Sequence, residues 1–207
     1  MKSKYRLFYF SEKTPAAAAI AAAACSVIYI ILGTVSGLTG LIDYFDLIVR
    51  VLVLAALLYS YMKHNLLLMQ AACIGLLFCM MYVQAYYALE TLYLKSAEEY
   101  IAMGFFGSIF VANELMILFV TLLIVVNHFI IFTVEKNSNI RIAVNQLCII
   151  VLLVLHVFQL FVFIGLKIGL WQTICFTVFA LSEIAALICV DSGELILALD
   201  RNERLGE

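Results

Sequence analysis

Proline is almost absent from this chain, which has a single proline, Pro15, in 207 residues. Proline breaks a helix because its ring removes a backbone donor and clashes with the preceding turn. Many transporters that alternate access use helices broken at Gly or Pro around a site near the membrane midplane. The long apolar runs contain no such break, and the two halves show no clear repeat. The sequence therefore predicts regular helices and disfavours that kind of carrier.

Charged residues are also scarce, at 13% of the chain against 66% apolar residues. A soluble domain normally carries about a quarter charged residues. The apolar residues come in runs of 20 or more, the length that a helix needs to cross roughly 30 Å of hydrocarbon. We therefore expect an all-α, polytopic membrane protein. With a net charge of −2 and no basic stripe, nucleic acid is not an expected partner.

Signs of a cofactor or of catalysis are missing as well. The three histidines do not have the spacing of metal ligands, and neither GxSG nor HExxH occurs. We expect no metal and no cofactor, and the sequence leans against an enzyme. The six cysteines form no CxxC pair and behave as small apolar residues inside spans, so no disulfide framework is implied. They are Cys25, Cys73, Cys79, Cys148, Cys175 and Cys189.

The apolar runs predict a bundle of six transmembrane helices over residues 15–191. Pro15 suits the first helical position, where its missing donor costs no hydrogen bond. Residues 1–14 precede the bundle, and residues 192–207 form a tail that either extends the last helix or makes a short strand at ILALD. The predicted spans are 15–40, 43–62, 66–89, 105–134, 143–166 and 169–191.

Lysine and arginine set the expected orientation, because cytoplasmic loops retain them. With the N-terminus inside, the inner segments hold nine of these residues and the outer loops hold only Lys95 and Lys167. Both termini are therefore expected in the cytoplasm, with the chain in the plasma membrane. The nine inner residues are Lys2, Lys4, Arg6, Lys13, Lys63, Lys136, Arg141, Arg201 and Arg204.

Polar residues inside the spans are the candidate binding site or ion path. Counting about 1.5 Å per residue from each span's end predicts two layers at different depths. The outer layer comprises Arg50, Gln84, Glu114, His156 and Gln159, and the inner layer comprises Asn127, His128 and Glu183.

Each buried charge needs a partner, since a charge at the bilayer centre costs roughly 2.5–3.5 kcal/mol on insertion scales. Arg50 cannot lose its proton; Asp46, one turn away, is a local partner, and Glu114 is the deeper alternative. We expect the helices carrying Arg50 and Glu114 to face each other. Glu114, Thr121 and His128 recur every seven residues, which keeps them on one helix face.

The first span also contains small residues, including Gly33 and Gly37 in the segment GTVSG. Small residues let membrane helices approach closely, so we predict a packing role for both glycines. The sequence leaves open whether their partner helix belongs to this chain or to another subunit.

Intramembrane ionisable residues favour a functional role by default. The sequence predicts a subunit that transports a small solute or ion by means of its buried polar residues. The alternative is a non-catalytic sensor or an assembly subunit whose polar residues only hold the helices together. In either case we expect contact with the lipid bilayer and with a membrane-protein partner or a second copy of the chain.

Overall fold

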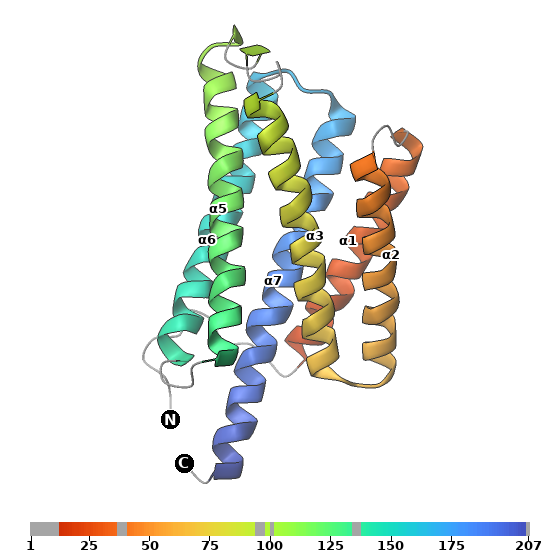
Figure 1. Ribbon diagram of the computed structural model, residues 1–207, viewed down its shortest axis with the longest axis vertical. Coiled ribbons are helices and arrows are strands. Elements are labelled where there is room, and N and C mark those ends of the chain that lie inside the picture. Colours follow the sequence, from red (N-terminus) through yellow and green to blue (C-terminus); the bar gives the residue numbers. More distant parts are fainter. Residues whose placement is uncertain (1–12, 37–40, 94–97, 100–101, 134–137, 206–207) are drawn as a thin grey trace.

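Six long helices in alternating directions make up the fold (Figure 1). The computed structural model describes residues 13–36, 41–93, 98–99, 102–133 and 138–205, and these residues contain no strand. The predicted all-α class is confirmed. The helices are α1 (Thr14–Ser36), α2 (Leu41–Met62), α3 (Leu66–Tyr93), α5 (Phe105–Thr133), α6 (Ser138–Gly165) and α7 (Leu170–Leu205).

Two of the tight connections use the same backbone motif. His64 after α2 and Lys167 after α6 have positive φ angles of 49° and 56°. At the end of α2, the N–H of His64 donates to the carbonyl of Tyr61, and the N–H of Asn65 donates to that of Ser60. This pair of bonds satisfies carbonyls that the helix end would otherwise leave open. The chain therefore reverses at once, and Asn65 then caps α3 through its side-chain oxygen.

Helices α3 and α7 lie at the centre of the bundle. α7 packs against α1, α3 and α6, while α3 packs against α1, α2, α5 and α7. α2 contacts α1 and α3, whereas α5 contacts α3 and α6. Consequently α2 and α5 lie on opposite sides of the molecule (Figure 1).

The contact between α1 and α7 is lined by small side chains. Ala18, Ala19 and Ala22 of α1 are buried, and Ser26 Oγ lies 2.9 Å from Ser182 Oγ across the interface. Small residues allow this close approach because their short side chains leave room for the two backbones to come near each other.

Gly33 has no close neighbour among the described residues of this chain, because a Cβ built there meets nothing within 4 Å. The small residues that do pack lie earlier in α1, where α7 runs alongside. A role for Gly33 against another subunit stays a prediction. Gly37 lies outside the described residues.

Five of the six helices are long and apolar enough to cross a membrane, and the bundle exposes large apolar side chains on its outside. The chain is thus an integral membrane protein in contact with lipid. α2 is not among the five, so its span stays a prediction. The buried residues of α2 lie on a single stripe and are Asp46, Arg50, Val53, Leu57 and Ser60.

The last helix is longer than expected. α7 continues to Leu205 and passes beyond the other helices at the lower end of the molecule (Figure 1). The strand alternative for ILALD is therefore wrong, and the tail continues α7 as far as Leu205. α1 begins at the same end, so the start of the first helix and the end of the last share one side of the bundle.

Gly193 lies where α7 passes close to α3, and a Cβ built there would be 2.4 Å from the side-chain nitrogen of Gln70. That nitrogen donates to the carbonyl of Val190 at 3.1 Å. We expect Gly193→Ala to displace Gln70 and to lose about 0.5–1.5 kcal/mol of stability for the broken hydrogen bond.

Gly33→Ala is the matched control, since the same substitution in a helix stabilises by about 1 kcal/mol through helix propensity. The Cβ added at Gly33 has open space around it. Thermal unfolding of both variants in the same detergent measures the difference. Equal stability of the two variants would contradict the close approach at Gly193.

Candidate functional site

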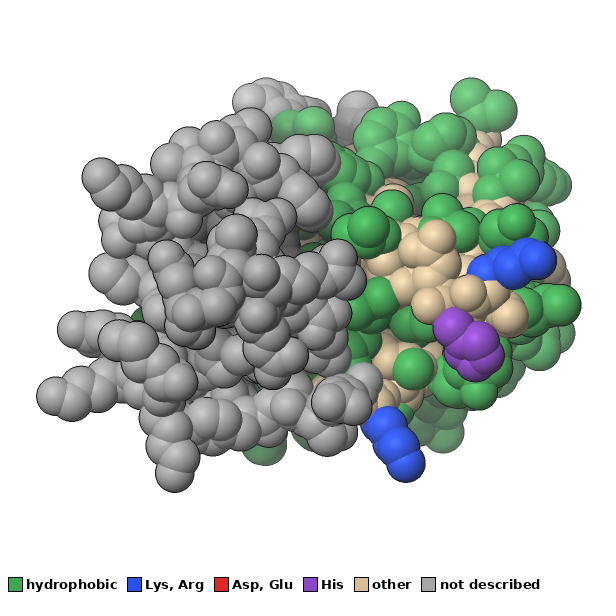
Figure 2. Space-filling model, turned by 90° about the horizontal axis from the view of Figure 1, so that it is seen from below, with side chains coloured by type: hydrophobic (Ala, Val, Ile, Leu, Met, Phe, Trp, Pro, Cys, Tyr) green, Lys and Arg blue, Asp and Glu red, His purple; other side chains and the backbone are tan. Residues whose placement is uncertain are grey.

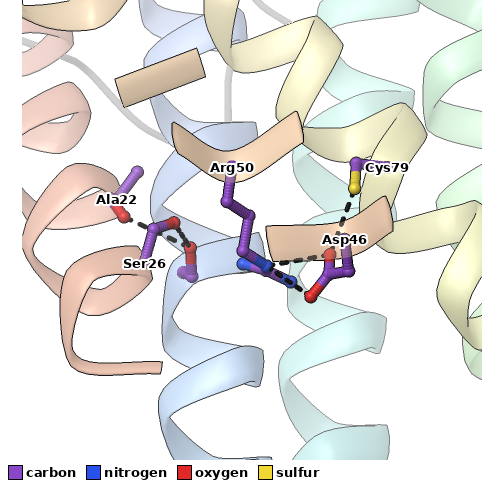
Figure 3. Close-up of polar contacts among 6 residues, drawn as sticks. Ala22, Ser26, Asp46, Arg50 and Cys79 are labelled. Carbon is purple, nitrogen blue, oxygen red and sulfur yellow. Dashed lines mark hydrogen bonds and ion pairs between the residues drawn. The ribbon is translucent and has the colours of Figure 1, made fainter. Parts of the chain in front are cut away.

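A buried ion pair lies between α2 and its neighbours (Figure 3). Arg50 is 0% exposed, and its Nε donates to both carboxylate oxygens of Asp46, at 2.9 and 2.8 Å. The Cys79 thiol also donates to Asp46, at 3.1 Å. The guanidinium lies 4.3 Å from the ring centroid of Tyr29 and 5.4 Å from that of Phe179. These aromatic faces attract the cation and compensate part of its lost hydration.

The expected contact between Arg50 and Glu114 is wrong. Arg50 takes the local partner Asp46, four residues earlier on the same helix. The physical reason is topological, because α2 and α5 occupy opposite sides of the bundle, with α3 and α7 between them (Figure 1). Arg50 can contact a carboxylate one turn away on its own helix without any packing between helices. Contact with Glu114 would require α2 and α5 to be neighbours.

Four helices converge on a second buried carboxylate, that of Glu183 on α7, which is 0% exposed. Gln84 of α3 donates its amide N–H to Oε2 at 3.1 Å. Thr121 of α5 donates to Oε1 at 2.7 Å. Nε2 of His156 on α6 lies 3.0 Å from Oε2. Hydrogen bonds to a charged group are worth about 1.5–3 kcal/mol each, so these contacts offset part of the cost of burying Glu183.

Glu114 lies in an adjoining branch of this network. Its Oε1 accepts a hydrogen bond of 2.8 Å from Gln159 of α6, and Gln159 in turn accepts one of 2.6 Å from Asn113. Gln159 is three residues after His156, so both point from the same face of α6. Glu114 is only partly buried, whereas Gln159 is fully buried. The branch therefore leads from the flank of the bundle towards His156.

Aromatic side chains cover the network on the side of the α6–α7 turn. Phe176 contacts the ring of His156 with a centroid distance of 5.5 Å. Phe163 contacts Phe176 at 5.0 Å and stacks on Phe110 at 5.9 Å. Three helices contribute to this cover, which separates His156 from that end of the bundle.

A second polar layer lies nearer the lower end of the bundle. Gln146 donates to Asp191 at 3.3 Å, and Asn127 donates to Asn145 at 2.6 Å. Gln70 donates to a backbone carbonyl of α7. Asn145, Gln146 and Asp191 are all 0% exposed.

A layer of aliphatic side chains separates the two polar layers. Leu77, Ile124, Leu152 and Leu187 are each 1% exposed or less and belong to one packed core. Each lies on its helix between a residue of the Glu183 network and a residue of the lower layer. On three helices the polar residues that flank this layer are fourteen positions apart, about 21 Å along the axis, and share one face. They are Gln70 and Gln84, Asn113 and Asn127, and Asn145 and Gln159.

The predicted assignment of Glu183 to the layer of His128 is wrong, since Glu183 contacts His156 and Gln84. The depth estimate failed because α7 continues to Leu205, so the end of its apolar run does not mark a level shared with the other helices. Asn127 does lie in the lower layer, bonded to Asn145. The side chain of His128 lies outside what the structure describes.

Sequence reasoning did not single out Asp191 and Gln70 as members of a buried layer. Both lie near the ends of predicted spans, where polar residues usually meet the headgroups. The signal that could have found Gln70 is its spacing of fourteen residues from Gln84. Asp191 follows Glu183 by eight residues, a spacing that keeps both side chains on the same broad stripe of a helix.

The described residues hold no group of three or more His, Cys, Asp or Glu side chains placed to bind a metal ion. Comparison of the chain with known protein families, with curated proteins and with solved structures finds no match. The arrangement of the side chains themselves is thus the basis for a functional proposal.

Removing one partner of the Arg50–Asp46 pair should destabilise the protein more than removing both. Asp46→Asn leaves a buried guanidinium without a carboxylate, and loss of one partner of such a pair costs about 3–5 kcal/mol. The double variant Asp46→Asn/Arg50→Met should recover most of that loss, because a buried ion pair and apolar side chains are often similar in stability. Unfolding of the three proteins in detergent tests this; equal losses in the single and double variants would contradict a coupled pair.

Proposed function

We propose that this membrane protein is a transport subunit that passes a small ion through the core formed by α3, α5, α6 and α7. The observation that carries the proposal is the convergence of four helices on the carboxylate of Glu183. Glu183 contacts its three partners directly, which suits an ion better than a bulky organic solute.

The energetics favour a role beyond holding the helices together. Polar contacts between membrane helices contribute about 0.6 kcal/mol on average, whereas an ionisable side chain at the bilayer centre costs several times more. Apolar packing would hold the helices together without that cost. A carboxylate and an imidazole in direct contact at this depth therefore support a site that exchanges an ion.

The aliphatic layer supports a gated path. It lies between the Glu183 network and the lower polar layer, and both of those layers hold buried groups that can bind an ion. An ion at Glu183 would have to pass Leu152 and its three neighbours to reach Asp191. Passage thus requires a rearrangement of the helices, as expected for a transporter and not for an open pore.

The distribution of charge supports the orientation proposed for the bundle. Lys13 and the α2–α3 turn with Lys63 and His64 are exposed at the lower end, and Figure 2 shows basic side chains and no acidic one on the described part of that face. Because cytoplasmic segments retain Lys and Arg, we propose that this end of the bundle faces the cytoplasm.

A sensor or assembly subunit is the second candidate, and the Arg50–Asp46 pair favours it. The charges of that pair neutralise each other within one helix, and the pair lies on the flank away from α5, so its charge balance needs no transported ion. Its position between α1, α2, α3 and α7 suits a role in fixing the helices. Under this reading the polar core would serve the same purpose.

Glu183→Gln should abolish ion flux while retaining the shape of the side chain. Purified protein in liposomes, driven by a membrane potential, should pass at least one of H⁺, Na⁺ and K⁺. The variant should fall to the level of protein-free liposomes, because the amide cannot supply the negative charge. Glu99→Gln is the matched control, since Glu99 is exposed outside the core. Undiminished flux through folded Glu183→Gln protein would refute the assignment.

Leu152→Ala should open a leak through the aliphatic layer. Truncation of this fully buried side chain leaves a cavity next to His156 and costs about 2–5 kcal/mol of stability. We expect a several-fold rise in passive ion flux in the same liposomes. Leu153→Ala is the control, because the neighbouring Leu153 is 48% exposed on the outside of the bundle. Equal flux through both variants would show that the layer is not a gate.

A further inference from the structure

Two buried polar atoms beside Glu183 have no hydrogen-bond partner among the described residues. They are Nδ1 of His156 and Oε1 of Gln84. His156 is 4% exposed and Gln84 is 7% exposed, so solvent does not reach these atoms from outside the bundle. A buried polar group without a partner costs about 1–3 kcal/mol, and its persistence next to a carboxylate points to a bound species.

The geometry assigns the hydrogen on His156. A neutral imidazole carries one N–H, and an ionised carboxylate only accepts hydrogen bonds. Since Nε2 lies 3.0 Å from Oε2 of Glu183, the hydrogen resides on Nε2. Nδ1 then presents a lone pair, which is the basic atom of the ring.

The groups around Glu183 select against a metal cation. Gln84 directs an amide N–H at one oxygen and Thr121 directs a hydroxyl at the other. The amide and the hydroxyl both direct the positive ends of their dipoles towards the carboxylate. A metal ion bound there would instead need oxygen atoms that accept. A proton, in contrast, requires only one lone pair.

Resting on the transport function proposed above, we propose that the ion is a proton and that Nδ1 of His156 binds it. Binding forms one N–H bond at Nδ1 and leaves the Nε2–H···Oε2 contact with Glu183 in place. The pair changes from a net charge of −1 to 0, as imidazolium beside carboxylate. Release at Nδ1 reverses the step, so that no other reactant is needed.

The groups that face the pair from the surrounding helices are carboxyl, amide and hydroxyl groups. α7 contributes the carboxylate of Glu183, and α5 contributes Glu114, which is linked to α6 through Gln159. The side chain facing the pair from α3 is the uncharged Gln84. The one buried cation among the described residues, Arg50, is compensated by Asp46 and contacts Phe179 one turn before Glu183. Glu183 is thus the carboxylate in direct contact with His156.

Nuclear magnetic resonance of ¹⁵N-histidine in the full-length protein tests the proton site. The His156 resonances are assigned as those that disappear in His156→Gln. As the pH falls, Nδ1 of His156 should change from unprotonated to protonated, while Nε2 keeps its proton. In Glu183→Gln the proton affinity should fall at least about tenfold, because one charge at hydrogen-bond distance is lost. A Nδ1 that never titrates, or that titrates unchanged in Glu183→Gln, would overturn the proposal.

Proton flux into liposomes, followed with an enclosed pH-sensitive dye, separates this proposal from the broader one. Wild-type protein should carry protons, and both His156→Gln and Glu183→Gln should lose this flux. His64→Gln, the same substitution at an exposed turn, should retain it. Thermal unfolding of each variant establishes that it is folded. If His156→Gln does not fold, the comparison of Glu183→Gln with His64→Gln tests the proposal.

Flux of another ion that depends on Glu183, without proton flux, would overturn the proton assignment and leave the transport function intact. Absence of any ion flux through folded wild-type protein would refute the transport function and, with it, the proposal that the transported ion is a proton. Proton flux lost in both core variants and kept in His64→Gln would support both.

Discussion

A carboxylate in hydrocarbon has to find its hydrogen-bond donors on neighbouring helices, and this constraint organises the core around Glu183. Its donors come from α3, α5 and α6, so these contacts favour one relative register of the four helices. A shift of any helix by one turn would remove a donor and leave a buried charge less satisfied, at a cost of a few kcal/mol. The network therefore fixes the relative heights of the helices as well as providing the candidate site.

Polar and apolar layers alternate along the same helices. On three helices the repeat of fourteen residues places two polar groups on one face, and Leu77, Ile124 and Leu152 of the aliphatic layer lie between them. Such an arrangement holds two buried sites apart by a packed hydrophobic barrier.

The buried ion pair of Arg50 illustrates how much of the site the sequence could predict. That Arg50 needs a carboxylate follows from its charge and its place in an apolar run, and Asp46 was within reach by spacing alone. The alternative, Glu114, failed because sequence does not state which helices are neighbours. Likewise, the contact of Glu183 with His156 depends on how far α7 extends beyond its apolar run, which composition does not reveal.

The amino-acid sequence alone determined the helical class and the membrane setting, because these follow from local hydrophobicity and the length of the apolar runs. It also indicated that Arg50, His156 and Glu183 would be buried, but not Gln70 or Asp191. Only the tertiary structure decided how those residues are paired, and it did so through helix order and relative height. A hydrogen bond reaches about 3 Å, so an error of one helical turn, roughly 5.4 Å, is enough to exchange one partner for another.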